Sequence, residues 1–173
     1  MKRGYIQVYT GSGKGKTTAA LGLALRAVGH GLRVCVVQFM KDDRETGELQ
    51  TARLLKPRLS IHPMGPPGFI RKKPRAIDYQ MAQKALDFSR SIILDEKYDV
   101  VILDEINVAI HFGLVSLDDL LALIDAKPDS VELVLTGRDA RPEIIERADL
   151  VTEMVAVKEY FEKGVAARKG IEE

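Results

Sequence analysis

Residues 9–31 read YTGSGKGKTTAALGLALRAVGHG, and this stretch decides the fold. Glycines and lysines alternate in its first half, and an apolar run that fits a helix follows them. The arrangement approaches the phosphate-loop pattern G-x-x-x-x-G-K-[ST], although Thr10 stands where the first glycine of that pattern belongs. The stretch therefore predicts a loop that binds a nucleotide, and the altered start leaves open whether the nucleotide is hydrolysed or used in another reaction.

The composition of this loop explains how it would bind phosphate. Three glycines free the backbone so that successive N–H groups can curve around an anion: Gly11, Gly13 and Gly15. Lys16 would lie against the outer phosphates, and Thr17 would offer its hydroxyl to Mg²⁺. A helix that begins at about Lys16 directs the positive end of its dipole at the same point. Lys14 adds a second cation that the general pattern does not require.

A second motif supplies carboxylates to the same region. The segment VVILDEIN (100–107) predicts an apolar strand that ends in Asp104 and Glu105. The carboxyl end of a parallel strand lies at the sheet edge where a phosphate loop also opens. One of the two carboxylates can hold Mg²⁺ there, directly or through water. Together with the loop, the motif predicts a magnesium site.

The sequence does not decide the roles of two arginines. Arg138 follows the apolar strand of LVLTGRDA (133–140), where it could reach the nucleotide or cap the next helix, and the sequence leaves both roles open. Arg26, one turn before the end of the first helix, reads by default as a surface cation with a buried stem.

Short apolar runs alternate with longer helical patterns along the chain. Several runs are apolar on both faces, as in a parallel sheet covered on each side by helices. The predicted strands are 5–9, 33–39, 99–104, 131–136 and 150–155. The predicted helices lie near 16–28, 76–95, 116–125 and 141–147, and the first is apolar almost all round, which predicts deep packing against the sheet. The alternation predicts a doubly wound α/β sheet in a single domain over residues 1–173.

Composition narrows the function classes. The net charge of +1 excludes a global field that would draw the chain to nucleic acid or membrane. The only cysteine, Cys35, forms no internal disulfide and indicates a reducing compartment, so we expect a cytoplasmic protein. Cys35 lies among valines and reads as a core residue. The three histidines are too dispersed for a metal site and read as structural: His30, His62 and His111.

One stretch is irregular. HPMGPPGFIRKKPR (62–75) holds four prolines, two glycines and four cations, and we expect no regular element in it. It is either a solvated surface loop or a lid over the site.

Several blocks of the sequence resemble a known family. VYTGSGKGKTTAALGLALRAVGHG, VVQFMK, GEL, LDEINVAI, TGR, ADLVTEM and GVAARKGIE are similar, in the same order, to the ATP:corrinoid adenosyltransferases of the cob(I)yrinic acid a,c-diamide type. The resemblance covers nearly the whole chain. It implies a RecA-like P-loop NTPase fold, a three-layer α/β architecture with a mostly parallel central sheet.

The resemblance also implies a reaction. Members of the family transfer the 5′-deoxyadenosyl group of ATP to a reduced Co(I) corrinoid and release triphosphate, with Mg²⁺ as cofactor. Lys14, Lys16 and Arg138 would then be catalytic, and Thr17 with Asp104 or Glu105 would hold the metal. The implied substrate-binding set is Gly11, Ser12, Gly13, Lys14, Gly15, Lys16, Thr17, Thr18, Arg26, Phe69 and Arg138. A homodimer and a flavoprotein that reduces the cobalt are the implied partners.

The chain departs from the family pattern at two places. An aromatic residue, commonly Trp, usually stands two residues after the Gly-Phe pair, but here Arg71 follows Phe69 at that spacing and the chain has no Trp. This departure bears on removal of the lower cobalt ligand and on the preferred corrinoid. Near the C-terminus, where Lys-His-x-Phe is usual, residues 158–161 read Lys-Glu-Tyr-Phe.

Two other functions compete with this one. A RecA-like ATPase that acts on nucleic acid draws support only from the basic run at 71–75, and the near-zero net charge argues against it. A non-catalytic sensor of nucleotide or corrinoid would explain the missing aromatic, but the intact Lys16 and Asp104 argue against it.

Overall fold

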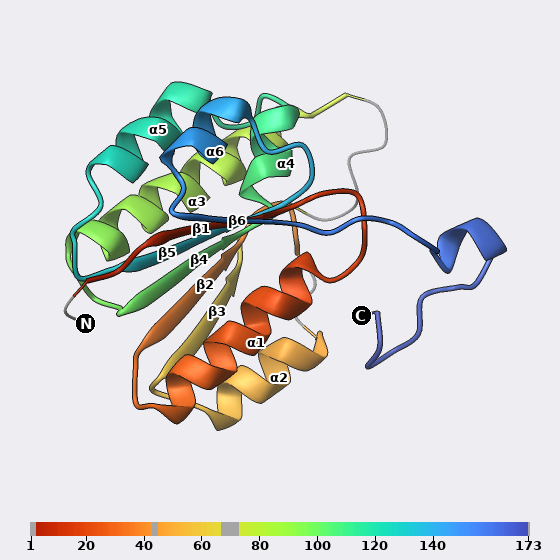
Figure 1. Ribbon diagram of the computed structural model, residues 1–173, viewed down its shortest axis with the longest axis horizontal. Helices are drawn as coiled ribbons and strands as arrows, with labels where there is room; N and C mark the ends of the chain where they lie inside the picture. Colours follow the sequence, from red (N-terminus) through yellow and green to blue (C-terminus); the bar gives the residue numbers. More distant parts are fainter. Residues whose placement is uncertain (1–2, 43–44, 67–72, 173) are drawn as a thin grey trace.

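The computed structural model of the chain describes residues 3–42, 45–66 and 73–172, and a parallel sheet forms its centre (Figure 1). Every pairing between neighbouring strands is parallel, in the order β3-β2-β4-β5-β1-β6. The strands are β1 (Ile6–Thr10), β2 (Val34–Gln38), β3 (Leu59–Pro63), β4 (Val100–Asp104), β5 (Glu132–Thr136) and β6 (Leu150–Glu153). Parallel strands need crossovers, and the helices supply them.

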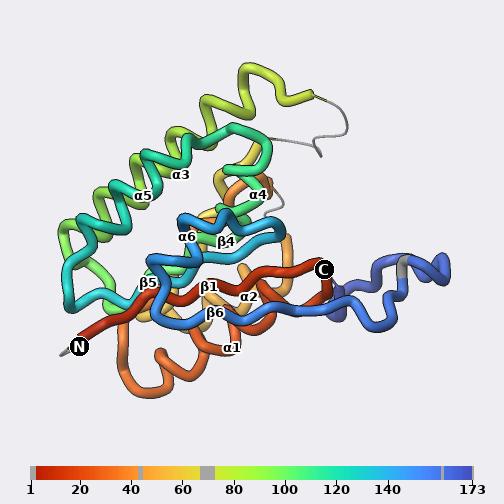
Figure 2. Tube along the Cα trace, turned by 45° about the horizontal axis from the view of Figure 1, so that its top comes forward, coloured from red at the N-terminus to blue at the C-terminus, as the bar shows by residue number. Residues whose placement is uncertain are grey.

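The helices cover both faces of the sheet, so the molecule has three layers (Figures 1 and 2). One face carries α1 (Lys16–Gly29) and α2 (Gly47–Leu54). The other face carries α3 (Ala76–Leu94), α4 (Ile106–His111), α5 (Leu117–Asp125) and α6 (Pro142–Arg147). Each helix layer closes its own apolar core against the sheet. The predicted three-layer α/β fold is confirmed.

Burial follows the position of each strand in the sheet. All five residues of β2, of β4 and of β5 are buried, because helices cover these central strands on both sides. All four residues of β6, an edge strand, are exposed. The predicted strand over 150–155 is shorter in the structure and ends at Glu153.

The first helix differs from the prediction. Only one side of α1 is fully buried, a row of small residues at Ala20, Ala24 and Ala27 beside Lys16, whereas Leu25 is 58% exposed. The alanines let the helix axis approach the sheet closely, and the leucines of the apolar run lie along the flanks or face solvent. An apolar composition all round does not here mean burial all round.

The stretch 62–75 also differs from the prediction at its start. His62 and Pro63 complete β3, which the sequence analysis did not find, and this edge position tolerates a proline because its missing N–H faces away from β2. Residues 67–72, which include Phe69 and Arg71, lie outside the described part of the chain.

After β6 the chain leaves the three layers and extends beyond the carboxyl edge of the sheet (Figure 2). It contains one short 3₁₀ turn, η1 (Phe161–Lys163). Among the described residues, no helix is long and apolar enough to cross a membrane.

Candidate functional site

The loop between β1 and α1 has the geometry that its glycines predict. Gly11 and Gly15 have φ values of 94° and 122°, which side chains other than glycine rarely adopt. The ammonium of Lys16 donates hydrogen bonds to the carbonyl oxygens of Gly11 at 2.8 Å and Gly13 at 2.7 Å. These bonds hold the loop curved, with α1 beginning at its end.

Lys16 is a buried cation. Burial lowers its pKa, Glu105 opposes that shift, and Arg138 reinforces it. Three predicted site residues from separate elements are therefore close enough to act on one another, although the intervening chain is long. Ser12, Lys14 and Thr18 are exposed along the same loop and the first turn of α1.

Asp104 is the centre of the site. It is completely buried at the end of β4, and both of its carboxylate oxygens accept hydrogen bonds. Oδ1 accepts from the hydroxyls of Thr17 at 2.8 Å and Thr136 at 2.7 Å. Oδ2 accepts from the ammonium of Lys41 at 2.8 Å and from the amide of Gln38 at 3.5 Å. The start of α1 and the ends of β2 and β5 are thus tied to one carboxylate at the end of β4.

Lys41 had no predicted role, although it closes the VVQFMK block. It follows β2, and β2 pairs directly with β4 so that Gln38 lies beside Asp104. Burial alone would lower the pKa of Lys41, but the carboxylates of Asp104, Glu105 and Glu48 together outweigh burial and raise it, with Asp104 contributing most. A lysine soon after a strand is common, so the sequence carries no signal that would single this one out.

Glu105 occupies a strained position beside Asp104. Its φ of 63° and ψ of 18° place it in the left-handed region, which is unusual for a residue with a side chain. Its backbone N–H donates to the hydroxyl of Thr136 at 3.0 Å, and this bond holds the turn. Burial raises the pKa of Glu105, and the neighbouring Asp104 raises it further. Two carboxylates therefore lie together where a cation would relieve their repulsion.

The end of β5 presents Arg138 to the same edge of the sheet. Gly137 packs tightly on α4, because a side chain there would meet Asn107 and Val108 at 3.0 Å. Arg138 itself is exposed, and its charge acts on Lys16 and Glu105. The alternative that Arg138 caps the next helix is wrong, because Arg141 holds the N-cap position of α6.

Arg26 lies apart from this group. It is exposed in the last turn of α1, about 15 Å along the helix axis from Lys16 at 1.5 Å per residue. Its charge acts on Tyr9, whose pKa is raised mainly by burial. Its nucleotide role stays a prediction.

The chain after β6 packs directly on the phosphate loop. The N–H of Gly13 donates to the carbonyl of Met154 at 2.7 Å, and the N–H of Lys14 donates to the carboxylate of Glu159 at 3.1 Å. A side chain at Gly11 would collide with Met154, and one at Gly13 would meet the backbone of Val155 at 2.8 Å. This close approach by itself therefore requires glycine at both positions of the loop. No local pattern in the sequence predicted a role for this segment.

The described start of the 62–75 stretch also borders the site. Gly65 donates its N–H to the carbonyl of Lys41 at 2.8 Å, and a side chain at Gly65 would collide with the backbone of Met40. At the far end, the carboxylate of Asp78 accepts the N–H of Arg75 at 2.6 Å, at the start of α3. The start of the 62–75 stretch is thus hydrogen-bonded to Lys41, the residue that pairs with Asp104.

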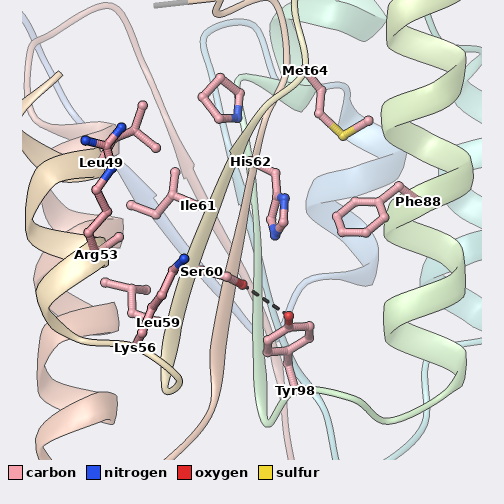
Figure 3. A pocket seen from close by; sticks show the side chains of 12 residues that line it. Leu49, Arg53, Lys56, Leu59, Ser60, Ile61, His62, Met64, Phe88 and Tyr98 are labelled. Atoms are coloured by element: carbon pink, nitrogen blue, oxygen red, sulfur yellow. Dashed lines mark hydrogen bonds between the residues drawn. The ribbon is translucent and has the colours of Figure 1, made fainter. Parts of the chain in front are cut away.

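A separate cavity of about 550 Å³ follows the outer edge of β3, between α2 and α3 (Figure 3). His62 faces Phe88 there, with ring centroids 4.9 Å apart, and burial lowers the pKa of His62. The hydroxyl of Ser60 donates to that of Tyr98 at 3.2 Å. None of the lining residues belongs to the predicted binding, catalytic and metal residues, although His62, Pro63 and Met64 open the stretch predicted as a surface loop or lid.

Fold and site together define a nucleotide-binding protein of the phosphate-loop class with a RecA-like sheet. A solved structure with this architecture is the KaiC-like protein of Pyrococcus horikoshii, which superposes with a TM-score of 0.62. It covers 91% of this chain and 75% of its own, at 16% sequence identity. This likeness concerns the fold alone.

The family is narrower than the class. The model of the family described as ATP:corrinoid adenosyltransferase BtuR/CobO/CobP matches residues 2–172, and the chain belongs to that family. The corrinoid adenosyltransferase of Pseudomonas aeruginosa is 41% identical over 99% of this chain and 84% of its own. Corrinoid adenosyltransferase CobA of Salmonella typhimurium is 36% identical over 99% of this chain and 86% of its own. The resemblance found in the sequence is confirmed.

Proposed function

We propose that the chain transfers the 5′-deoxyadenosyl group of ATP to the Co(I) centre of a reduced corrinoid of the cob(I)yrinic acid a,c-diamide type. The family supports adenosyl transfer from ATP to a corrinoid. The observation that carries the proposal is the joining of the phosphate loop to a buried carboxylate, through the 2.8 Å bond between Thr17 and Asp104. This arrangement binds a nucleotide at the carboxyl edge of the sheet.

The reaction requires no nucleophile from the protein, because Co(I) itself is the nucleophile. The electron pair of Co(I) forms the cobalt–carbon bond to C5′. The bond between C5′ and the triphosphate oxygen breaks, and triphosphate leaves with the electron pair of that broken bond. The protein must align the three reacting atoms and stabilise the charge that gathers on triphosphate. Lys14, Lys16 and Arg138 supply positive charge for this purpose, together with the N–H groups of the loop.

We assign Mg²⁺ to Thr17, Asp104 and Glu105. A hydroxyl and two carboxylates are the hard oxygen donors that this ion prefers, with phosphate oxygens and water completing its shell. The raised pKa of Glu105 fits such a site, because a cation there would offset both its burial and the charge of Asp104. When bound, Mg²⁺ supplies additional charge to the triphosphate group.

We further propose that residues 62–75 form a lid over the site. The contact between Gly65 and Lys41 supports this role, because it places the start of the 62–75 stretch beside the ion pair of Lys41 and Asp104. A closed lid would exclude water and oxygen from the reduced cobalt. By family analogy, the enzyme would be a cytoplasmic homodimer of one domain per chain, supplied with electrons by a flavoprotein.

The test is anaerobic incubation of the purified protein with chemically reduced corrinoid and Mg-ATP. We expect a light-sensitive product with a cobalt–carbon bond in the absorbance spectrum, and intact triphosphate as the second product. Release of ADP and phosphate with unchanged corrinoid would instead favour the nucleic-acid ATPase. Binding of either substrate without turnover would favour the sensor.

Lys16→Ala tests the site within the same assay. We expect at least a hundredfold loss of turnover, because the buried ammonium is one of the groups placed to stabilise the leaving triphosphate. Lys84→Ala, on the exposed face of α3, is the matched control and should leave turnover unchanged. Near-normal turnover in Lys16→Ala would refute the phosphate role of the loop.

A further inference from the structure

A carboxylate of the protein lies on the phosphate loop. Glu159 Oε1 accepts a hydrogen bond from the backbone N–H of Lys14 at 3.1 Å, although 145 positions separate the two residues. The charge of Glu159 also acts on Lys16. Glu159 belongs to the 158–161 segment, where the sequence departs from the family pattern. The proposed function gives this side chain no role.

The segment that carries Glu159 is held in place from both sides. Its start is fixed because Met154 accepts the N–H of Gly13 and donates its own N–H to Thr10. Its far side is ordered by Arg168, which lies 5.1 Å over the ring of Tyr160 and forms an ion pair with Glu172 at 2.8 Å. These contacts explain why the carboxylate meets the loop. They leave Glu159 itself half-buried and within reach of solvent.

The chemistry of the contact is that of a bound anion. Loop N–H groups that curve around a phosphate offer their hydrogens to any oxyanion of suitable size, and a carboxylate resembles one edge of a phosphate. Two anions cannot accept the same N–H, and their like charges repel at this distance. A phosphate group that takes the Lys14 N–H must therefore displace Glu159.

We propose that Glu159 occupies an anion position of the phosphate loop and competes there with the triphosphate group, weakening the hold of the loop on the triphosphate product. The proposal rests on the proposed role of the loop as the triphosphate site. An enzyme whose leaving group carries many negative charges needs a means to release it, and a tethered carboxylate provides one. The position lost by triphosphate is then refilled by the protein.

The experiment is equilibrium binding of inorganic triphosphate, with Mg²⁺ present, to the full chain and its variants. Glu159→Gln keeps the size of the side chain and removes its charge, so we expect triphosphate to bind about three- to tenfold more tightly. Glu162→Gln removes an exposed charge three residues further along and should bind as the unmodified protein does. Added triphosphate should also inhibit adenosyl transfer more strongly in Glu159→Gln than in Glu162→Gln.

The possible outcomes distinguish a failure of this proposal from a failure of the proposed function. Unchanged or weaker triphosphate binding in Glu159→Gln would overturn the competition and make the contact a brace of the loop. Glu159→Asp is a second variant. It keeps the negative charge, but its shorter side chain holds the carboxylate further from the N–H of Lys14, so it too should bind triphosphate more tightly. If Lys16→Ala binds triphosphate as well as the unmodified protein, the loop is not the triphosphate site and the proposed function fails first.

Discussion

Replacing Lys41 with Met should destabilise the protein through Asp104. The ammonium of Lys41 lies 2.8 Å from Oδ2 of Asp104, whose side chain is 1% exposed, and only the 3.5 Å bond from Gln38 would remain on that oxygen. Removing one partner of a fully buried ion pair costs about 3–5 kcal/mol. The side chain of Lys41 is 34% exposed, so solvent already screens part of the interaction. We therefore expect a loss of about 2 kcal/mol.

The assay is urea unfolding at neutral pH, supported by thermal unfolding. A loss of about 2 kcal/mol corresponds to a Tm lower by about 4–8 °C for a chain of this size. Lys84→Met, on an exposed face, should change the free energy of unfolding by less than about 0.5 kcal/mol. In an Asp104→Asn background, Lys41→Met should cost less than about 0.5 kcal/mol, because its charged partner is gone.

The pH dependence follows from the raised pKa of Lys41. A raised pKa in the folded protein means that the stabilisation is complete below the ordinary lysine pKa of 10.5 and is lost as pH rises through the folded value. The difference between Lys41→Met and the unmodified protein should therefore be constant from about pH 6 to about pH 9. An equal cost of Lys41→Met in both backgrounds would refute the reasoning, since the cost would then not come from Asp104.

Three further substitutions test the packing and the core. Gly137→Ala should lower the free energy of unfolding by more than about 1 kcal/mol, because φ there is 129° and a methyl group would meet α4 at 3.0 Å. Gly22 has open space around it in α1, so Gly22→Ala should raise the free energy of unfolding by about 0.5–1 kcal/mol in the same urea assay. Equal effects of the two changes would contradict the contact with α4. Burial raises the pKa of the Cys35 thiol to about 11 from 9.0, so the unfolded state loses the proton first and stability should fall between about pH 9 and pH 11. Cys35→Ala should remove that part of the slope, and a native thiol that reacts rapidly with a disulfide reagent at about pH 8 would contradict the burial.

The local sequence pattern was enough to predict an element where that element is long or strongly apolar. The loop and α1 follow from glycines that precede an apolar run, and β2, β4 and β5 follow from β-branched residues buried on both faces. The same reasoning missed β3, whose five residues include a histidine and end in a proline, and α2, which is only eight residues long. Both are marginal by local propensity and form because the sheet and α1 give them a surface on which to pack.

The sequence by itself determined most chemical groups of the predicted site: the loop, the strand that ends in Asp104 and Glu105, and Arg138 after the strand of 131–136. Only the tertiary structure decided which of them meet. The strand order places the ends of β2 and β5 on either side of β4, which brings Lys41 and Thr136 to Asp104. It also places β6 beside β1, so that Glu159 reaches the phosphate loop. Such contacts join residues 32 to 145 positions apart, and local periodicity reports which face of an element is apolar but not which element packs beside it.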